Sequence, residues 1–134
     1  MTLSDELVEV LIESARAVRD NAYAPYSGFR VGAAVISESG KIYVGCNVES
    51  ASYGATLCAE RAALAQMIAA GEHRVVTVAV FVDGAEPAMP CGICRQWISE
   101  LGPRAEIVSA TPRSVKRTTI EQLLPDPFVL KRGE

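Results

Sequence analysis

The chain has 134 residues, and its 13 Lys or Arg against 16 Asp or Glu give a formal net charge of −3 at pH 7. Hydrophobic residues make up 49% and charged residues 22%, which is typical of a folded globular protein and excludes a disordered one. At this length we expect a single domain, residues 1–134, with one core. The acidic balance argues against nucleic acid as a partner.

The sequence gives no sign of a membrane partner or of export. No apolar run approaches the roughly 20 residues that cross a bilayer. Acids interrupt residues 1–20, which is typical of neither a secretory signal nor a transit peptide. We therefore expect a cytoplasmic protein.

The first predicted elements are a helix and a hairpin. Thr2 and Asp5 have the spacing of a capping pair, and apolar residues then recur every three or four positions. This helix is expected to end near Tyr23, before a proline. Residues 29–36 and 41–46 read as two strands joined by a turn, so they predict a hairpin.

Two further strands and helices follow. Thr56 is expected to cap a helix that reaches Ala70. Residues 75–82 are a nearly unbroken apolar and β-branched run, which is typical of a strand covered on both faces. A third helix is expected from Cys91 to about Gly102, before a short strand at 107–108.

Thr118 and Glu121 have the spacing of a capping pair for a last short helix. The elements read from the pattern are thus four helices and four strands in alternation, with helices expected on both faces of a sheet. The unit from residue 75 to residue 108 predicts a parallel crossover, and the early hairpin makes the sheet mixed. The basic residues Arg113, Lys116 and Arg117 are expected to form a solvated edge.

Four cysteines are present: Cys46, Cys58, Cys91 and Cys94. In a reducing compartment, clustered cysteines bind metal or do redox chemistry more often than they form disulfides. Cys91 and Cys94 form a C-x-x-C pair, and this pair alone fits a metal site or a dithiol equally well. Cys46 ends a strand and is expected to be a small buried thiol.

Three cysteines lie at the starts of two predicted helices that follow sheet elements. Cys58 is expected in the first turn of the second helix, and Cys91 and Cys94 in the first turn of the third. Helix starts of this kind meet at one edge of an open α/β sheet, and their partial positive charge favours thiolates. Three thiolates can bind Zn²⁺ and leave its fourth position open, as in catalytic zinc sites.

Two neighbours of Cys58 extend the pattern. Glu60 can shuttle protons beside the open position without binding the metal. Arg61 can donate hydrogen bonds to the sulfurs and restore the acidity of an ion that carries three thiolates. The combination of C-A-E with a downstream P-C-x-x-C is the signature of zinc-dependent nucleobase deaminases.

Five motifs then stand in order: A-P-Y-S-x-F-x-V-G-A-A (24–34), G-C-N-V-E (45–49), C-A-E-R (58–61), P-C-G-x-C-R-Q (90–96) and L-L-P-x-x-F (123–128). With them, nearly the whole chain resembles the small homotetrameric cytidine deaminases. The resemblance implies a three-layer α/β/α sandwich with a mixed five-stranded sheet and one Zn²⁺ per subunit, held by Cys58, Cys91 and Cys94. It also implies deamination of cytidine and 2′-deoxycytidine to uridine and 2′-deoxyuridine, with release of ammonia, in pyrimidine salvage.

The resemblance also implies roles for single residues. Glu60 would take a proton from zinc-bound water, the hydroxide would attack C4, and Glu60 would pass protons to N3 and to the leaving amine. Asn47 and Glu49 match the pair that binds the ribose, and Phe29 matches the aromatic side chain that packs on the pyrimidine. The backbone of Ala59 is implied to contact the base.

Tyr53 and Phe128 resemble residues that enter the active site of a neighbouring subunit, so the resemblance implies a homotetramer with shared sites. Ser50 departs from the family, which often has Asn after the ribose-binding Glu, and this shorter side chain is expected to loosen the loop. Arg95 can support the cysteines or contact another subunit, and the sequence leaves both open. Trp97 is expected in the core or in subunit packing.

Two other interpretations compete with a nucleoside deaminase. A related enzyme could deaminate a nucleoside antibiotic or polynucleotide cytosines, although the net charge of −3 argues against nucleic acid. A structural zinc or dithiol protein would have a four-cysteine site or a reversible Cys91–Cys94 disulfide. That interpretation leaves Glu60, Asn47 and Glu49 without a role.

Overall fold

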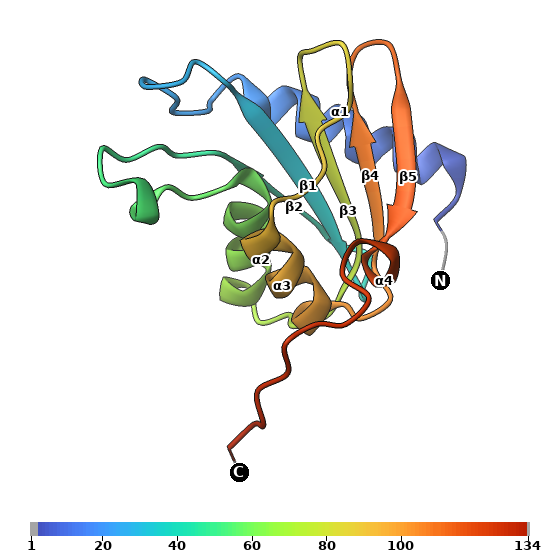
Figure 1. The fold of residues 1–134 in the computed structure, drawn as a ribbon. Coiled ribbons are helices and arrows are strands. Elements are labelled where there is room, and N and C mark those ends of the chain that lie inside the picture. The colour runs from blue at the N-terminus through green and yellow to red at the C-terminus, as the bar shows by residue number, and fades with distance from the viewer. Residues whose placement is uncertain (1–2, 134) are drawn as a thin grey trace.

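Five strands form one mixed sheet in a computed structural model that describes residues 3–133 (Figure 1). The strand order across the sheet is β2-β1-β3-β4-β5. The elements in chain order are α1 (Asp5–Arg19), β1 (Val31–Ser37), β2 (Ile42–Cys46), the 3₁₀ helix η1 (Tyr53–Ala55), α2 (Ala59–Ala69), β3 (Val75–Val82), α3 (Gly92–Leu101), β4 (Glu106–Ala110), β5 (Val115–Thr119) and α4 (Ile120–Leu123).

The strand directions follow from the connections. β1 and β2 pair antiparallel across a short turn, so the predicted hairpin is confirmed. β3 and β4 pair parallel, with α3 as their crossover, which confirms the predicted β-α-β unit. β3 also pairs antiparallel with β1, which makes the sheet mixed.

Helices cover both faces of the sheet. Figure 1 shows α1 on one face, with α2 and α3 on the other. Side chains of a strand alternate between faces, so Ala33 and Val35 of β1 join the core cluster under α2 and α3. Ala34 and Ile36 join the second cluster, which lies under α1. The three-layer sandwich is therefore confirmed.

The fifth strand, β5, does not appear among the strands read from the sequence pattern. Its residues Val115, Lys116 and Arg117 are exposed, and it pairs on one side with β4. Arg117 is not simply solvated, as had been expected: its guanidinium forms ion pairs with Glu106 at 2.9 Å and with Asp5 at 3.1 Å. This edge strand is specified by pairing rather than by a buried face.

Three helix starts differ from the prediction by one or more residues. The expected cap at Thr2 lies outside the described residues, and Ser4 caps α1 by accepting a hydrogen bond from the Leu7 N–H at 3.3 Å. Thr119, rather than Thr118, caps α4. Thr56 does not cap α2, because the N-cap residue is Cys58, and the Thr56 hydroxyl instead accepts a hydrogen bond from the Ser50 N–H at 3.1 Å.

The ends of the elements differ in a similar way. α1 stops at Arg19 rather than near Tyr23, and a loop leads from there to β1. α2 ends where expected, with Gly71 just beyond it at a φ of 93°, which glycine adopts without strain. Across residues 3–133, no helix combines the length and apolar character needed to span a bilayer.

Candidate active site

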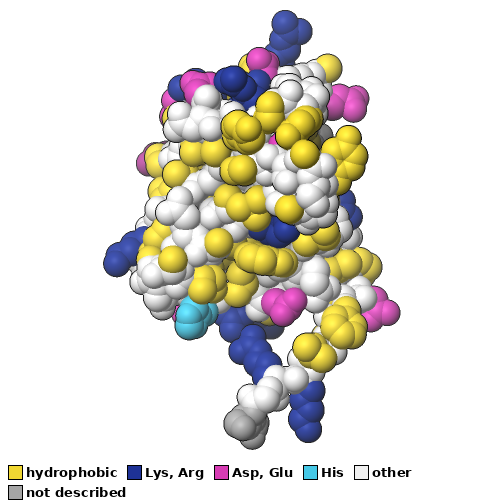
Figure 2. Space-filling view, turned by 90° about the vertical axis from the view of Figure 1, so that its left-hand side faces the viewer, with side chains coloured by type: hydrophobic (Ala, Val, Ile, Leu, Met, Phe, Trp, Pro, Cys, Tyr) yellow, Lys and Arg dark blue, Asp and Glu magenta, His cyan; other side chains and the backbone are white. Residues whose placement is uncertain are grey.

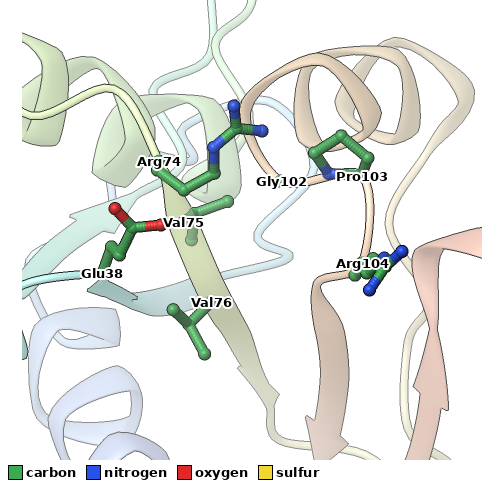
Figure 3. A pocket seen from close by; sticks show the side chains of 7 residues that line it. All are labelled: Glu38, Arg74, Val75, Val76, Gly102, Pro103 and Arg104. Atoms are coloured by element: carbon green, nitrogen blue, oxygen red, sulfur yellow. The ribbon is translucent and has the colours of Figure 1, made fainter. Parts of the chain in front are cut away.

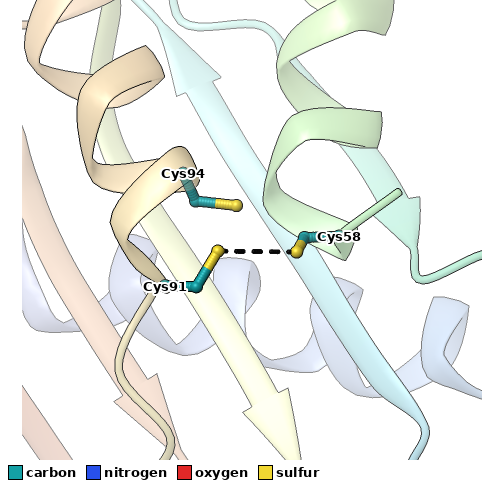
Figure 4. A group of neighbouring side chains, drawn as sticks. All are labelled: Cys58, Cys91 and Cys94. Carbon is teal, nitrogen blue, oxygen red and sulfur yellow. Dashed lines mark hydrogen bonds between the residues drawn. The ribbon is translucent and has the colours of Figure 1, made fainter. Parts of the chain in front are cut away.

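Three cysteine side chains meet where α2 and α3 begin. Cys58 is the N-cap residue of α2, Cys91 is the N-cap residue of α3, and Cys94 lies in the first turn of α3 (Figure 4). Neither capping cysteine bonds to its own helix through its side chain. The sulfur atoms of all three cysteines lie within 4.8 Å of one another.

The sulfur positions fit a zinc ion. With Zn–S bonds of about 2.3 Å in tetrahedral geometry, two ligating sulfurs lie about 3.8 Å apart. The Sγ atoms of Cys58 and Cys91 are 3.6 Å apart, and both residues are free thiols. Cys46 is a free thiol outside this group and is only partly buried rather than buried as expected, and this partial burial raises its pKa.

One thiol of the cluster ionises readily, and a second resists ionisation beside it. Hydrogen bonding from Cys94, and then from Arg61 and Cys91, lowers the pKa of Cys58 to about 5. The pKa of Cys94 is raised, first because its thiol bonds to the Cys58 sulfur and then because it is buried. Arg61 Nη2 donates to Cys58 Sγ at 3.3 Å and to the Thr56 carbonyl at 3.2 Å, as the predicted supporting role requires.

Glu60 is a buried acid beside the sulfurs. Its side chain lies in the first turn of α2, the residue is only 5% exposed, and burial raises its pKa to about 7. A cavity of about 200 Å³ contains Glu60 and two of the cysteines, and its lining residues are Phe29, Val31, Asn47, Thr56, Cys58, Ala59, Glu60, Val80, Ala88, Met89 and Cys91. A small molecule in this cavity would contact both the acid and the sulfur cluster.

The predicted base-binding residues line the same cavity. Phe29 is 52% exposed and lies at the cavity, whereas Ala59 is fully buried there. Asn47 uses its amide on the backbone, because Oδ1 accepts from the Val31 N–H at 2.9 Å and Nδ2 donates to the Phe29 carbonyl at 2.8 Å. Asn47 thereby fixes the segment that carries Phe29.

Glu49 lies beside a second hollow of about 230 Å³, which also contains Tyr53. Its carboxylate accepts hydrogen bonds from the backbone N–H groups of Tyr26 at 2.9 Å and Ser27 at 3.1 Å, and from the Ser27 hydroxyl. These bonds, that of the Ser27 hydroxyl first, lower the pKa of Glu49. Thr56 lines both hollows and so joins the surroundings of Glu49 to those of Glu60.

The two residues expected to act across subunits are among the most exposed. Tyr53 is 84% exposed and Phe128 is 69% exposed, and Phe128 does not line the cavity that holds Glu60. Trp97 is not core: it is 37% exposed on α3. Figure 2 shows hydrophobic side chains spread over the side of the molecule where α2 lies.

Some lining residues were not singled out by the sequence reasoning. Val80 and Met89 line the cavity that holds Glu60, and Ser27 holds Glu49. Val80 belongs to a uniformly apolar strand, so no local pattern separates a lining side chain from a core one. Ser27 lies within the first of the family motifs but carried no assigned role.

A larger cavity lies away from the cysteines. It measures about 320 Å³ and is found where β3 begins and where α3 connects to β4 (Figure 3). Glu38, Arg74 and Arg104 are its charged lining residues, and none of the cysteines lines it. It therefore lacks the sulfur cluster and the buried acid that give the smaller cavity its chemistry.

Residues 5–110 match a protein-family model described as the cytidine and deoxycytidylate deaminase zinc-binding region. The chain belongs to this family. Because the matched segment includes Cys58, Glu60, Cys91 and Cys94, the family's zinc-binding region coincides with the site described above.

The individual proteins that resemble this chain include several cytidine deaminases. The chain is 42% identical over 122 residues to a cytidine deaminase of Halalkalibacterium halodurans, covering 90% of this chain and 92% of the relative. The crystal structure of a cytidine deaminase from Burkholderia pseudomallei superposes with a TM-score of 0.87 at 45% identity, covering 94% of this chain and 100% of that one. A cytidine deaminase structure from Mycobacterium tuberculosis gives a TM-score of 0.80 at 38% identity, covering 96% and 100%.

Proposed function

We propose that this chain is a zinc-dependent cytidine deaminase. It hydrolyses cytidine and 2′-deoxycytidine to uridine and 2′-deoxyuridine and releases ammonia, with residues 1–134 acting as one catalytic domain. The observation that carries the proposal is the group of three sulfurs within 4.8 Å of one another, beside the buried Glu60. The cytidine deaminases among its relatives support the substrate class.

The chemistry divides between a metal and a carboxyl group. Cys58, Cys91 and Cys94 would hold a Zn²⁺ ion, which would supply Lewis acidity that lets water react at neutral pH. Glu60 would take one proton from the attacking water and pass it to N3 of the pyrimidine, and would then take the proton of the hydroxyl group added at C4 and pass it to the departing amine nitrogen. Cytidine and water thus become uridine and ammonia, and Glu60 ends in the state in which it began.

The surroundings of Glu60 suit this task. A general acid–base works best when its pKa lies near the working pH, because it must both hold and release a proton. Burial raises the pKa of Glu60 to about 7, well above the ordinary value of 4.5. Glu60 and Cys58 line the same cavity, so a substrate held there would lie beside both groups.

The same cavity supports a binding mode for the nucleoside. Phe29 packs on the pyrimidine, the backbone of Ala59 contacts the base, and Asn47 and Glu49 hold the ribose hydroxyls. Glu49 borders the neighbouring hollow rather than the cavity of Glu60, so the sugar extends past Thr56 toward it. The Glu49 carboxylate still has acceptor capacity for a hydroxyl, since each oxygen can accept more than one hydrogen bond.

The assembly we propose is a cytoplasmic homotetramer in which Tyr53 and Phe128 reach into a neighbouring subunit's site. Their exposed fractions of 84% and 69% support this, because side chains exposed to this extent are free to contact a neighbouring subunit. Sedimentation of the zinc-loaded protein tests it. We expect a mass near four times 14.3 kDa, and a stable monomer at working concentration would contradict it.

The decisive test replaces the acid. Glu60→Ala should keep the metal and lose about 10²–10⁴-fold in turnover, as removal of a general acid–base does. Turnover is followed by the ultraviolet change of cytidine, and zinc by metal analysis. The control is Glu9→Gln, an exposed acid on α1 that should leave turnover unchanged. Full turnover by Glu60→Ala, or preference for an oligonucleotide or a nucleoside antibiotic over cytidine, would contradict the proposal.

A further inference from the structure

Arg95 donates hydrogen bonds to backbone carbonyls just before its own helix, at the start of that helix and in α4. It follows Cys94 in α3 and is partly buried. Its Nε donates to the Pro90 carbonyl at 2.7 Å, and its Nη1 donates to the Leu123 carbonyl in α4 at 3.0 Å. Its backbone N–H also donates, to the Cys91 carbonyl at 2.9 Å.

Two of these bonds, those to the Pro90 and Cys91 carbonyls, hold the two peptide groups that flank Cys91. The Pro90 carbonyl belongs to the peptide group before the Cys91 Cα, and the Cys91 carbonyl belongs to the one after it. The orientations of those two groups define the backbone angles of Cys91, φ −70° and ψ 171°. Arg95 therefore holds the direction in which the Cys91 side chain leaves the backbone.

Cys91 has less other support than the remaining two cysteines. Cys94 is buried within the first turn of α3, and Cys58 receives a hydrogen bond from Arg61. Cys91 is exposed, and among the described residues its one side-chain hydrogen bond is with the Cys58 sulfur. Its placement thus depends mainly on its backbone.

A guanidinium suits the geometry in a way that other side chains do not. The two acceptors come from segments far apart in the chain, and the rigid fork of Arg offers separate N–H groups to each. A Lys ammonium is a single compact centre on a flexible stem, so it replaces this pair of bonds poorly. Pro90 is fully buried, so water cannot readily replace the lost donor at its carbonyl.

We propose that Arg95 is a positioning residue for Cys91, and that it joins the turn carrying this cysteine to the C-terminal segment at Leu123. This inference rests on the proposed zinc chemistry. Loss of the Arg95 side chain frees the Pro90–Cys91 peptide group, and Cys91 Sγ then spends less time where Cys58 and Cys94 can share an ion with it.

The test measures metal binding by the full-length chain. Zinc affinity is determined by competition with a chromophoric chelator for the wild type, Arg95→Met, Arg95→Lys and the control Arg113→Met, which removes an exposed Arg side chain in the turn before β5. We expect Arg95→Met to bind zinc about 10–100-fold more weakly, as loss of an outer partner of a metal ligand does. The zinc affinity of Arg95→Lys should lie between those of Arg95→Met and the wild type, and that of Arg113→Met should equal the wild-type value.

Two further measurements separate positioning from general stability. The absorption of the Co²⁺-substituted protein reports thiolate coordination, and Arg95→Met should weaken its sulfur-to-metal band. Thermal unfolding of the metal-free proteins reports stability alone. An Arg95→Met variant that unfolds earlier but keeps wild-type zinc affinity and cobalt absorption would overturn the proposal.

If Arg95→Met does not fold, Arg95→Lys decides by the same measurements, and wild-type zinc affinity in that variant overturns the proposal. A wild-type protein that does not bind zinc at all overturns the proposed function together with this inference. Wild-type zinc binding that every Arg95 variant keeps overturns the positioning role alone.

Discussion

Asn47 joins two peptide groups on the approach to β1, so its amide is part of the fold before any substrate arrives. It holds the Val31 N–H and the Phe29 carbonyl, and it is only 8% exposed. We expect Asn47→Ala to lower the free energy of unfolding by about 1–3 kcal/mol, because two backbone groups lose their partner.

Denaturant titration of the metal-free protein measures this loss. Asn21→Ala, at an exposed position just after α1, is the matched control and should stay within about 0.5 kcal/mol of the wild type. If Asn47→Ala proved as stable as the wild type, the amide would have no structural role.

Glu49 should make the stability of the loop at residues 26–27 depend on pH. Hydrogen bonds from Ser27 and Tyr26 lower its pKa below 4.5 in the folded chain, so folding favours the ionised carboxylate. The resulting stabilisation is present above the ordinary pKa and is lost as pH falls through the lowered folded value. Below pH 4.5 we therefore expect the loop at residues 26–27 to loosen before the rest of the molecule.

Amide hydrogen exchange at Tyr26 and Ser27 measures this loosening. In the wild type, the protection of these two amides from exchange should fall as pH drops below 4.5. In Glu49→Gln, their protection should not fall over this pH range. If the protection of these amides falls in Glu49→Gln as it does in the wild type, another titrating group causes the loosening.

The chemistry-bearing residues were predictable because their types and spacing are specific. The C-A-E and C-x-x-C patterns brought out Cys58, Glu60, Cys91 and Cys94, and the three sulfurs do converge. The backbone role of Asn47 was not predictable, because a sequence does not show that an amide proposed to bind a ligand also holds peptide groups of the fold. The bond between Glu49 and Ser27 joins residues 22 positions apart and has no local signature.

At the scale of elements, the contact between β2 and α2 decides where the first cysteine lies. A Cβ added to Gly45 would lie 2.4 Å from the Ala63 nitrogen and 2.7 Å from the Ala59 carbonyl oxygen, which are backbone atoms and cannot turn aside. Gly45→Ala should therefore push α2 away from the sheet and cost about 1–3 kcal/mol of stability.

Thermal unfolding of the metal-free protein tests this contact. The control is Gly54→Ala, because a Cβ there meets nothing within 4 Å. Equal melting temperatures for the two variants would mean that the close approach of β2 and α2 is not maintained in solution.

Helices and strands with a buried face were predictable from the sequence, whereas β5, which has no buried face, was not. β3 is buried along nearly its whole length, and its apolar run marks it clearly. β5 is V-K-R-T-T, with no apolar alternation, and it exists because β4 offers a partner and Arg117 an ion pair with Glu106. The caps of α1 and α4 are Ser4 and Thr119, because their side chains accept hydrogen bonds from the backbone N–H groups of Leu7 and Gln122.

For the molecule as a whole, metal and folding are coupled. A site assembled only in the folded chain stabilises it by an amount that grows with free zinc, and at 100 times the dissociation constant the gain is about 2.7 kcal/mol. The melting temperature of the wild type should therefore rise with zinc concentration in a calorimetric titration. Cys91→Ala, which removes one sulfur donor, should lose most of this rise, and an equal rise would place zinc elsewhere.

The two edges of the sheet have a consequence for how copies of this chain can meet. On β5 the exposed Lys116 and the ion-paired Arg117 make the free edge a poor template for edge-to-edge strand addition by another copy, which protects against aggregation. The strand at the opposite edge, β2, carries α2 on one face, with its close approach at Gly45. Sheet growth from the β5 edge is thus disfavoured, and the helical layer, where Ile68 and Trp97 are partly exposed, offers an apolar surface for self-association.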